Sequence, residues 1–98
     1  MREVTRICRR LQKVRGFKQP ITVIWHDMGP WAADVGFSVQ KQAYLIRLNP
    51  WRITTKDELI DTLIHEHAHI LSHGTTVPHG RAWGEAFAQI YRSYHKTR

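Results

Sequence analysis

The chain has 98 residues, 42% of them hydrophobic, which is enough to bury one modest core, so we expect a single domain over residues 1–98. Cys8 is the only cysteine, which excludes an intramolecular disulfide and a thiolate metal site. The net charge of +7 is compatible with an anionic partner and equally with a solvated basic surface.

A first helix is predicted over residues 4–14, where apolar residues recur at helical spacing before Gly16 provides a natural stop. Its other faces are mainly basic and carry Arg2, Arg6, Arg9, Arg10 and Lys13. The next segments are rich in β-branched and aromatic residues. They predict three short strands, at 21–26, 33–40 and 43–48, and an Asn-Pro turn closes the last one.

A second helix is predicted to begin at a capping box, in which Thr55 and Glu58 each bond the backbone of the other, and to run to Gly74. A third helix follows Pro78. Its apolar stripe is formed by Trp83, Phe87, Ile90, Tyr91 and Tyr94. Together these elements predict an α+β fold with an N-terminal helix, a three-stranded sheet and two further helices.

The second helix carries the residues that indicate a metal site. On a wheel of 100° per residue its apolar side chains fill an arc of roughly 180°, and His65, Glu66, His69 and His73 fall outside this arc. His65 and His69 are one turn and about 40° apart, so one zinc ion can bridge them. Glu66 lies roughly 60° beyond His69, where it can reach a metal-bound water without being a ligand. This is the His-Glu-x-x-His pattern.

Two neighbouring histidines have different predicted roles. His67 points into the apolar arc, and we expect a core histidine satisfied by one hydrogen bond rather than a ligand. His73 shares the metal side of the helix one turn beyond His69. Its alternatives are to orient a substrate, to replace a ligand, or to be exposed near the helix end, and we favour exposure.

A catalytic zinc normally has three protein ligands and an open position for water. The candidates for the third ligand are His79 and Glu85. If the third helix docks through its apolar stripe, His79 projects about 60° from the centre of the stripe and Glu85 about 180° from it. We therefore predict that His79 completes a site for one Zn²⁺ per chain. The longer zincin pattern, with a glycine and a third histidine on the same stretch, is excluded by Ser72 and Thr75.

The segment HEHAHILSHGTTVPHGRAW resembles the SprT-like zinc metallopeptidases, which are related to the Spartan-type proteases that degrade DNA–protein crosslinks. In it, the pattern His-Gly-x-x-Trp begins ten residues after His69. The upstream helix and the three-stranded sheet are similar to the minimal zincin-like core of that family. The resemblance therefore covers nearly the whole chain.

The resemblance implies that His65, His69 and His79 are zinc ligands and that Glu66 is the catalytic acid/base. The chain departs from the family at His67, where members commonly carry an aliphatic residue. It also does not show the zinc-ribbon or DNA-binding region that many members have, so recruitment to nucleic acid has to be tested separately.

The predicted activity is zinc-dependent hydrolysis of protein or peptide substrates. Glu66 accepts the proton of a zinc-activated water and returns it to the leaving amine. The donor for the oxyanion stays open among His73, Tyr91 and an arginine. An edge strand is expected to hold an extended substrate by backbone pairing, but the sequence does not identify that strand.

Two other functions are compatible with the sequence. The first is a basic nucleic-acid-binding module that contacts DNA non-specifically through Arg6, Arg9, Arg10 and Lys13. Trp25, Trp31 and Trp51 can stack on bases, although we expect them to pack in the core. The second is a non-catalytic zinc protein, which would normally need a fourth protein ligand and no carboxylate. With no apolar run of roughly 20 residues and no secretory signal, we expect a soluble, cytoplasmic protein away from membranes.

Overall fold

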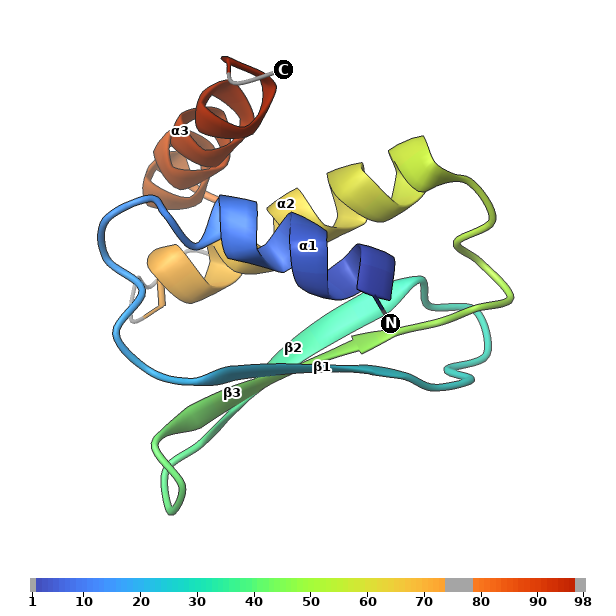
Figure 1. Ribbon diagram of the computed structural model, residues 1–98. Coiled ribbons are helices and arrows are strands. Elements are labelled where there is room, and N and C mark those ends of the chain that lie inside the picture. The colour runs from blue at the N-terminus through green and yellow to red at the C-terminus, as the bar shows by residue number, and fades with distance from the viewer. Residues whose placement is uncertain (1, 74–78, 97–98) are drawn as a thin grey trace.

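The computed structural model describes residues 2–73 and 79–96 and confirms the predicted α+β order of elements (Figure 1). The elements are α1 (Arg2–Leu11), β1 (Ile21–Trp25), β2 (Ala33–Ser38), β3 (Ala43–Leu48), α2 (Lys56–Leu71) and α3 (Arg81–Lys96). Gly74 and Pro78, which mark predicted boundaries, lie outside the described residues. None of the described helices is long and apolar enough to cross a membrane.

The sheet is mixed, with the strand order β1-β3-β2. The central strand, β3, pairs in parallel with β1, where Val23 lies opposite Ile46, and antiparallel with β2, where Val35 lies opposite Ile46. Alternate residues of β3 face the helices, so Tyr44, Ile46 and Leu48 are buried. In the part of the chain that the structure describes, β1 and β2 each pair only with β3 and are the edge strands of the sheet.

The helices α1 and α2 cover one face of the sheet, and α3 packs on these helices rather than on the strands (Figure 1). The core lies between these layers. Ile7 and Leu11 of α1, Leu63 and Ile64 of α2 and Ile90 of α3 are each at most 2% exposed. Burial of a side chain of this size stabilises the fold by about 1.5–3 kcal/mol, so the helix packing contributes a large share of the stability.

The first helix ends at Leu11, three residues before the predicted end at residue 14. Beyond it the backbone tightens into short turns, because Lys13 N–H donates to the carbonyl of Arg10 at 3.3 Å and Val14 N–H donates to that of Leu11 at 3.4 Å. Val14 is nevertheless buried, as the helical pattern predicted.

The second helix begins as predicted and ends earlier than predicted. The Thr55 side chain accepts from the backbone N–H of Glu58 at 3.1 Å, and the Glu58 carboxylate accepts from the N–H of Thr55 at 3.0 Å. At the other end the helix stops at Leu71, because the hydroxyl of Ser72 donates to the carbonyl of Ala68 at 2.7 Å and its N–H caps the last turn.

The exposed tryptophans correct an expectation from the sequence. Trp25, Trp31 and Trp51 are 37%, 69% and 75% exposed, so they do not pack in the core. Trp25 is the last residue of the edge strand β1. Trp31 lies in the loop before β2, and Trp51 lies in the loop between β3 and α2.

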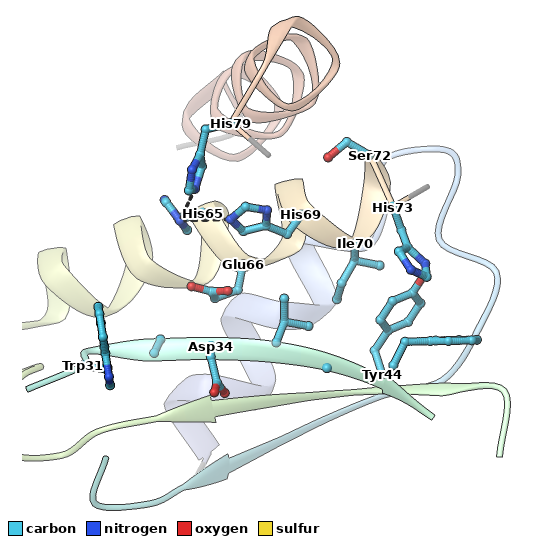
Figure 2. A pocket seen from close by; sticks show the side chains of 14 residues that line it. Trp31, Asp34, Tyr44, His65, Glu66, His69, Ile70, Ser72, His73 and His79 are labelled. Atoms are coloured by element: carbon cyan, nitrogen blue, oxygen red, sulfur yellow. Dashed lines mark hydrogen bonds between the residues drawn. The ribbon is translucent and has the colours of Figure 1, made fainter. Parts of the chain in front are cut away.

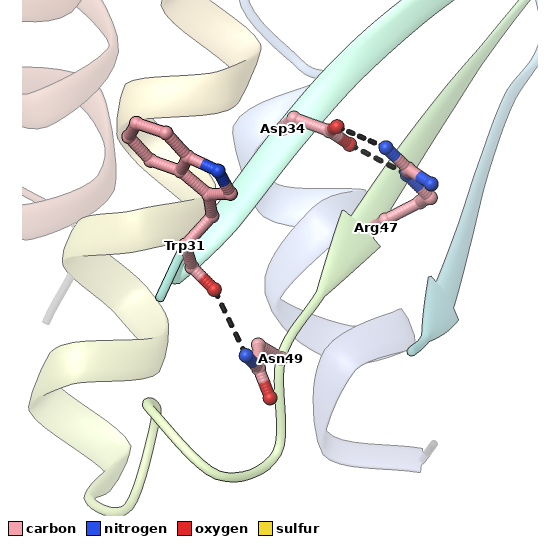
Figure 3. A network of polar contacts seen from close by, with 4 residues as sticks. All are labelled: Trp31, Asp34, Arg47 and Asn49. Atoms are coloured by element: carbon pink, nitrogen blue, oxygen red, sulfur yellow. Dashed lines mark hydrogen bonds and ion pairs between the residues drawn. The ribbon is translucent and has the colours of Figure 1, made fainter. Parts of the chain in front are cut away.

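The buried amide of Asn49 joins two of these loops (Figure 3). Its Nδ2 group donates to the carbonyl of Trp31 at 2.9 Å and to that of Gly29 at 3.2 Å. Its Oδ1 accepts from the N–H of Trp51 at 3.0 Å, and its own N–H donates to the carbonyl of Ala32 at 2.9 Å. The loop before β2 is thereby fixed to the turn that leads into α2.

Two glycines differ in the space around them. Gly16 has φ = +115°, and a Cβ added there would lie 2.5 Å from Cδ1 of Leu71. Gly84 lies inside α3, and a Cβ there would meet no described atom within 4 Å.

We expect opposite effects from alanine at these two sites. Gly16→Ala should destabilise the fold by more than about 1 kcal/mol, because it adds a steric overlap to an unfavourable backbone conformation. Gly84→Ala should stabilise it by about 0.5–1 kcal/mol through helix propensity. Urea unfolding followed by circular dichroism measures both, and an unchanged or increased stability of Gly16→Ala would contradict the packing described for Gly16.

Candidate metal centre

Two histidines on one side of α2 face toward α3 (Figure 2). His65 and His69 are separated by one helical turn, and their Nε2 atoms are 3.2 Å apart. Both side chains are half-buried. The pair therefore presents two ring nitrogens to one point between the helices.

The third imidazole comes from the residues that lead into α3. His79 has its Nε2 atom 3.3 Å from Nε2 of His65, and the ligand atoms of all three histidines lie within 4.8 Å of one another. His79 has φ = +56°, a left-handed conformation that histidine tolerates better than most residues. The carbonyl of Gly80 then accepts the N–H of Gly84 at 2.9 Å, which starts the helix directly after this turn.

The arrangement of the three nitrogens fits a tetrahedral metal ion. Two Zn–N bonds of about 2.0–2.1 Å at a tetrahedral angle place their nitrogens about 3.3–3.4 Å apart. The nitrogens of His69 and His79 lie 3.2 and 3.3 Å from that of His65, which agrees with this geometry, and the third separation is within 4.8 Å. Burial, and then the neighbouring histidines, lower the pKa of His69 to about 4, and the same causes lower the pKa of His65. These rings are thus neutral at pH 7, as metal ligation requires.

Trp83 packs against all three histidine rings. The centroid of its ring system lies 5.0 Å from that of His65, 5.7 Å from that of His69 and 4.8 Å from that of His79. Its Nε1–H donates to the backbone carbonyl of His65 at 3.4 Å. The sequence predicted Trp83 only as part of an apolar stripe, although its position one turn after His79 is consistent with this contact.

Glu66 lies between α2 and β2, below the histidines (Figure 2). The wheel placed it outside the apolar arc, yet it is only 5% exposed, because the sheet edge covers this side of the helix. Burial, and then the charge of Asp34, raise the pKa of Glu66 to about 7. Asp34 was not a predicted site residue. Its carboxylate pairs with Arg47, whose Nε donates to Oδ1 at 2.8 Å (Figure 3).

The three histidines and Glu66 line a cleft of about 560 Å³ between α2 and β2. The wall opposite the helix is β2 from Ala33 to Phe37. Because β2 pairs only with β3 among the described strands, its second edge is without a strand partner and borders the cleft. Of the two edge strands, β2 is thus the one whose residues line the cleft, and no described residue of β1 does so.

A hydrogen bond closes one end of the cleft. Nδ1 of His73 lies 2.7 Å from the hydroxyl of Tyr44, and its ring contacts Phe37. His73 is exposed, in agreement with the favoured alternative, and also borders the cleft. Burial raises the pKa of Tyr44, which favours its protonated form as a hydrogen-bond donor.

Residues 5–98 match the family model described as the SprT-like family. The chain belongs to the SprT-like family. The crystal structure of the metallopeptidase zymogen of Pyrococcus abyssi abylysin shares its fold, with a TM-score of 0.67 and 20% sequence identity over 95% of this chain and 86% of that chain. No match was found among curated protein sequences.

In this SprT-like chain, His67 is a buried core residue, as predicted, but it has two polar contacts rather than one. Its Nδ1 is 2.7 Å from the carbonyl of Leu63, and its Nε2 is 3.0 Å from Nε2 of Gln12. Burial lowers its pKa to about 4. The neutral ring therefore donates to Leu63 through Nδ1–H and accepts from the Gln12 amide through Nε2.

The SprT-like fold leaves other candidates away from the centre. Glu85, the rejected ligand, pairs with Arg81 at 3.1 Å on the surface. Tyr91 is 42% exposed and stacks on Phe87, outside the residues that line the cleft. Tyr91 does not lie on the buried side of α3, because that side is formed by residues spaced one turn apart: Ala86, Ile90 and Tyr94. Three basic residues of α1 and Lys13, which follows this helix, lie apart from the cleft and line a separate hollow: Arg6, Arg9, Arg10 and Lys13.

Proposed function

We propose that this SprT-like chain is a zinc metalloendopeptidase that hydrolyses protein substrates held along β2. The observation that carries this proposal is the convergence of three imidazole nitrogens beside a buried carboxylate in a cleft. His65, His69 and His79 would hold the ion. When bound, zinc would activate a water by lowering its pKa toward about 7 and would polarise the substrate carbonyl.

Glu66 supplies the proton transfers in this proposal. A pKa near neutrality allows one carboxylate both to accept a proton from water and to return it to the leaving amine. The backbone of β2 would hold the substrate by strand addition, which orients the peptide without a strong sequence requirement. The pair of His73 and Tyr44 supplies candidate donors for the oxyanion at one end of the cleft.

The described residues favour a catalytic over a structural metal site. A structural zinc normally has four protein ligands, whereas the described cluster contains three. Glu66, on the cleft side, is not a member of this cluster, which leaves a coordination position for water.

A second proposal concerns recruitment to DNA, including proteins crosslinked to it. The basic surface, formed by Arg6, Arg9, Arg10 and Lys13, lines one hollow on α1. Arg10 has a structural role there, because its Nη2 donates to the carbonyl of Tyr94 at 2.7 Å and its guanidinium lies 4.2 Å from the centre of that ring. The other three residues are thus the better positions at which to test phosphate binding.

The purified protein should contain about one equivalent of zinc, since three imidazoles form one open site. Alanine at His65, His69 or His79 should remove most of it, and Glu85→Ala should not. Elemental analysis by mass spectrometry measures the zinc content. Retention in His79→Ala together with loss in Glu85→Ala would show that the third ligand is wrong.

Glu66→Gln should retain zinc and fold but lose peptide hydrolysis by a factor on the order of 10² to 10⁴, because an amide of nearly equal size cannot accept the proton. Cleavage of an unfolded protein such as reduced casein gives the rate. Glu85→Gln is the matched control and should cleave at the wild-type rate. A wild-type rate in Glu66→Gln would contradict the proposed mechanism.

Affinity for DNA should fall with salt, with a log–log slope of about −0.7 to −0.9 for each phosphate neutralised. Reversal of Arg6, Arg9 and Lys13 to glutamate should weaken binding and flatten this slope without changing the zinc content. Reversal of the exposed residues Lys18, Lys41 and Arg92 changes the net charge equally and is the control. Fluorescence anisotropy at several salt concentrations measures both, and equal effects of the two triple variants would contradict a role of α1.

A further inference from the structure

Trp31 combines an exposed side chain with a backbone that is held in place. Its indole is 69% exposed, whereas its carbonyl accepts from the buried amide of Asn49 at 2.9 Å (Figure 3). The adjoining carbonyl of Gly29 accepts from Asn49 at 3.2 Å and from Nε of Arg52 at 3.1 Å. A large aromatic surface on a fixed backbone loses little conformational entropy when it binds a partner.

The position of Trp31 distinguishes it from the other exposed tryptophans. It lines the cleft at the end opposite Tyr44 and His73, with Glu66 between these two ends (Figure 2). Trp51 is similarly exposed, at 75%, but does not line the cleft. Only one of these two indoles is thus available to a molecule bound beside the histidines.

The charged residues of the cleft indicate which kind of molecule could bind beside the histidines. The described residues that line it include the carboxylates of Asp34 and Glu66 and include neither lysine nor arginine. Asp34 is also ion-paired with Arg47, which reduces its charge. The walls therefore offer no cationic side chain to bind phosphate groups, whereas the basic surface lines a different hollow.

We infer that Trp31 forms a side-chain subsite of the cleft and takes a large aliphatic or aromatic residue of an extended peptide. Trp31 lies two residues before Ala33, where β2 begins. A peptide that pairs with β2 and continues past Ala33 therefore lays a side chain on the indole. Contact with one large apolar side chain gives a discrimination of about 10- to 100-fold. This inference rests on the proposed function and names the substrate preference of that same cleft.

Binding is tested on the zinc-loaded Glu66→Gln protein, which keeps the cleft without consuming the peptide. The probes are blocked hexapeptides of one neutral sequence in which each position in turn carries Phe, Leu, Gly or Glu. At one position, Phe and Leu should bind about 10- to 100-fold tighter than Gly and Glu and should shift the indole N–H signal of Trp31 in NMR spectra. In this Glu66→Gln protein, a second substitution Trp31→Ala should remove the preference. Trp31→Tyr in its place should largely retain it, and Trp51→Ala should leave it intact.

The Trp31→Ala change leaves the hydrogen bonds of Asn49 in place, because they involve only the backbone of Trp31. Its fold is checked by circular dichroism and zinc content. Equal affinities for Phe and Glu peptides, or a Trp31 signal that responds to oligothymidine and not to peptides, would overturn the subsite. The second result would indicate stacking on a nucleobase.

Cleavage provides an independent comparison that separates this inference from the proposed function. Sites cut in an unfolded protein, mapped by mass spectrometry, should carry large apolar residues at one fixed distance from the cut, and Trp31→Ala should lose this preference. If Trp31→Ala still cuts with the same preference for large apolar residues, the proposed subsite is wrong, whereas the proposed endopeptidase activity stands. Binding that depends on Trp31 without any cleavage by the wild-type protein would support the subsite and refute the endopeptidase.

Discussion

The histidine cluster depends on the packing of α3 against α2, because His65 and His69 lie on α2 whereas His79 lies in the turn that leads into α3. At one end of α3, Trp83 contacts the imidazoles on both sides of this interface. At the other end, Arg10 of α1 binds the carbonyl and the ring of Tyr94. The apolar residues between them, including Ile90, are buried. The distance between His79 and His65 is thus set by contacts along the whole helix rather than by the short turn that carries His79.

The orientation of α2 about its own axis is controlled from the side opposite the cleft. His67 is fully buried and bonds Gln12 just beyond the end of α1. Residues at 67 and 69 of a helix lie about 160° apart around the axis, so this contact opposes any rotation that would carry His65 and His69 away from α3. A polar group in the core is costly unless it is satisfied, and here both ring nitrogens have partners. An aliphatic residue at this position would fill space but would not define the rotation in this way.

The local parts of this structure follow from the sequence, and the non-local parts do not. The capping box and the faces of α2 depend on residues within one helix, so periodicity predicted the positions of His65, Glu66 and His69. His79 required one further assumption, that α3 docks through its apolar stripe. The strand order, the burial of Glu66 and the positions of Asp34 and Trp31 depend on which element lies opposite. Helical periodicity shows which residues leave the core side of α2, but it does not show that β2 covers Glu66 there.

The same sheet order leaves a second strand, β1, at the outer edge. Its sequence, ITVIW, has no charged residue and consists of β-branched and aromatic side chains. Charges and prolines normally protect such edges against pairing with another chain. Here they flank the strand instead, with Lys18 and Pro20 before it and Asp27 after it. In a partly unfolded chain, β1 is thus suited to start amyloid-like stacking, and its flanking residues limit the length of chain that can join such a stack.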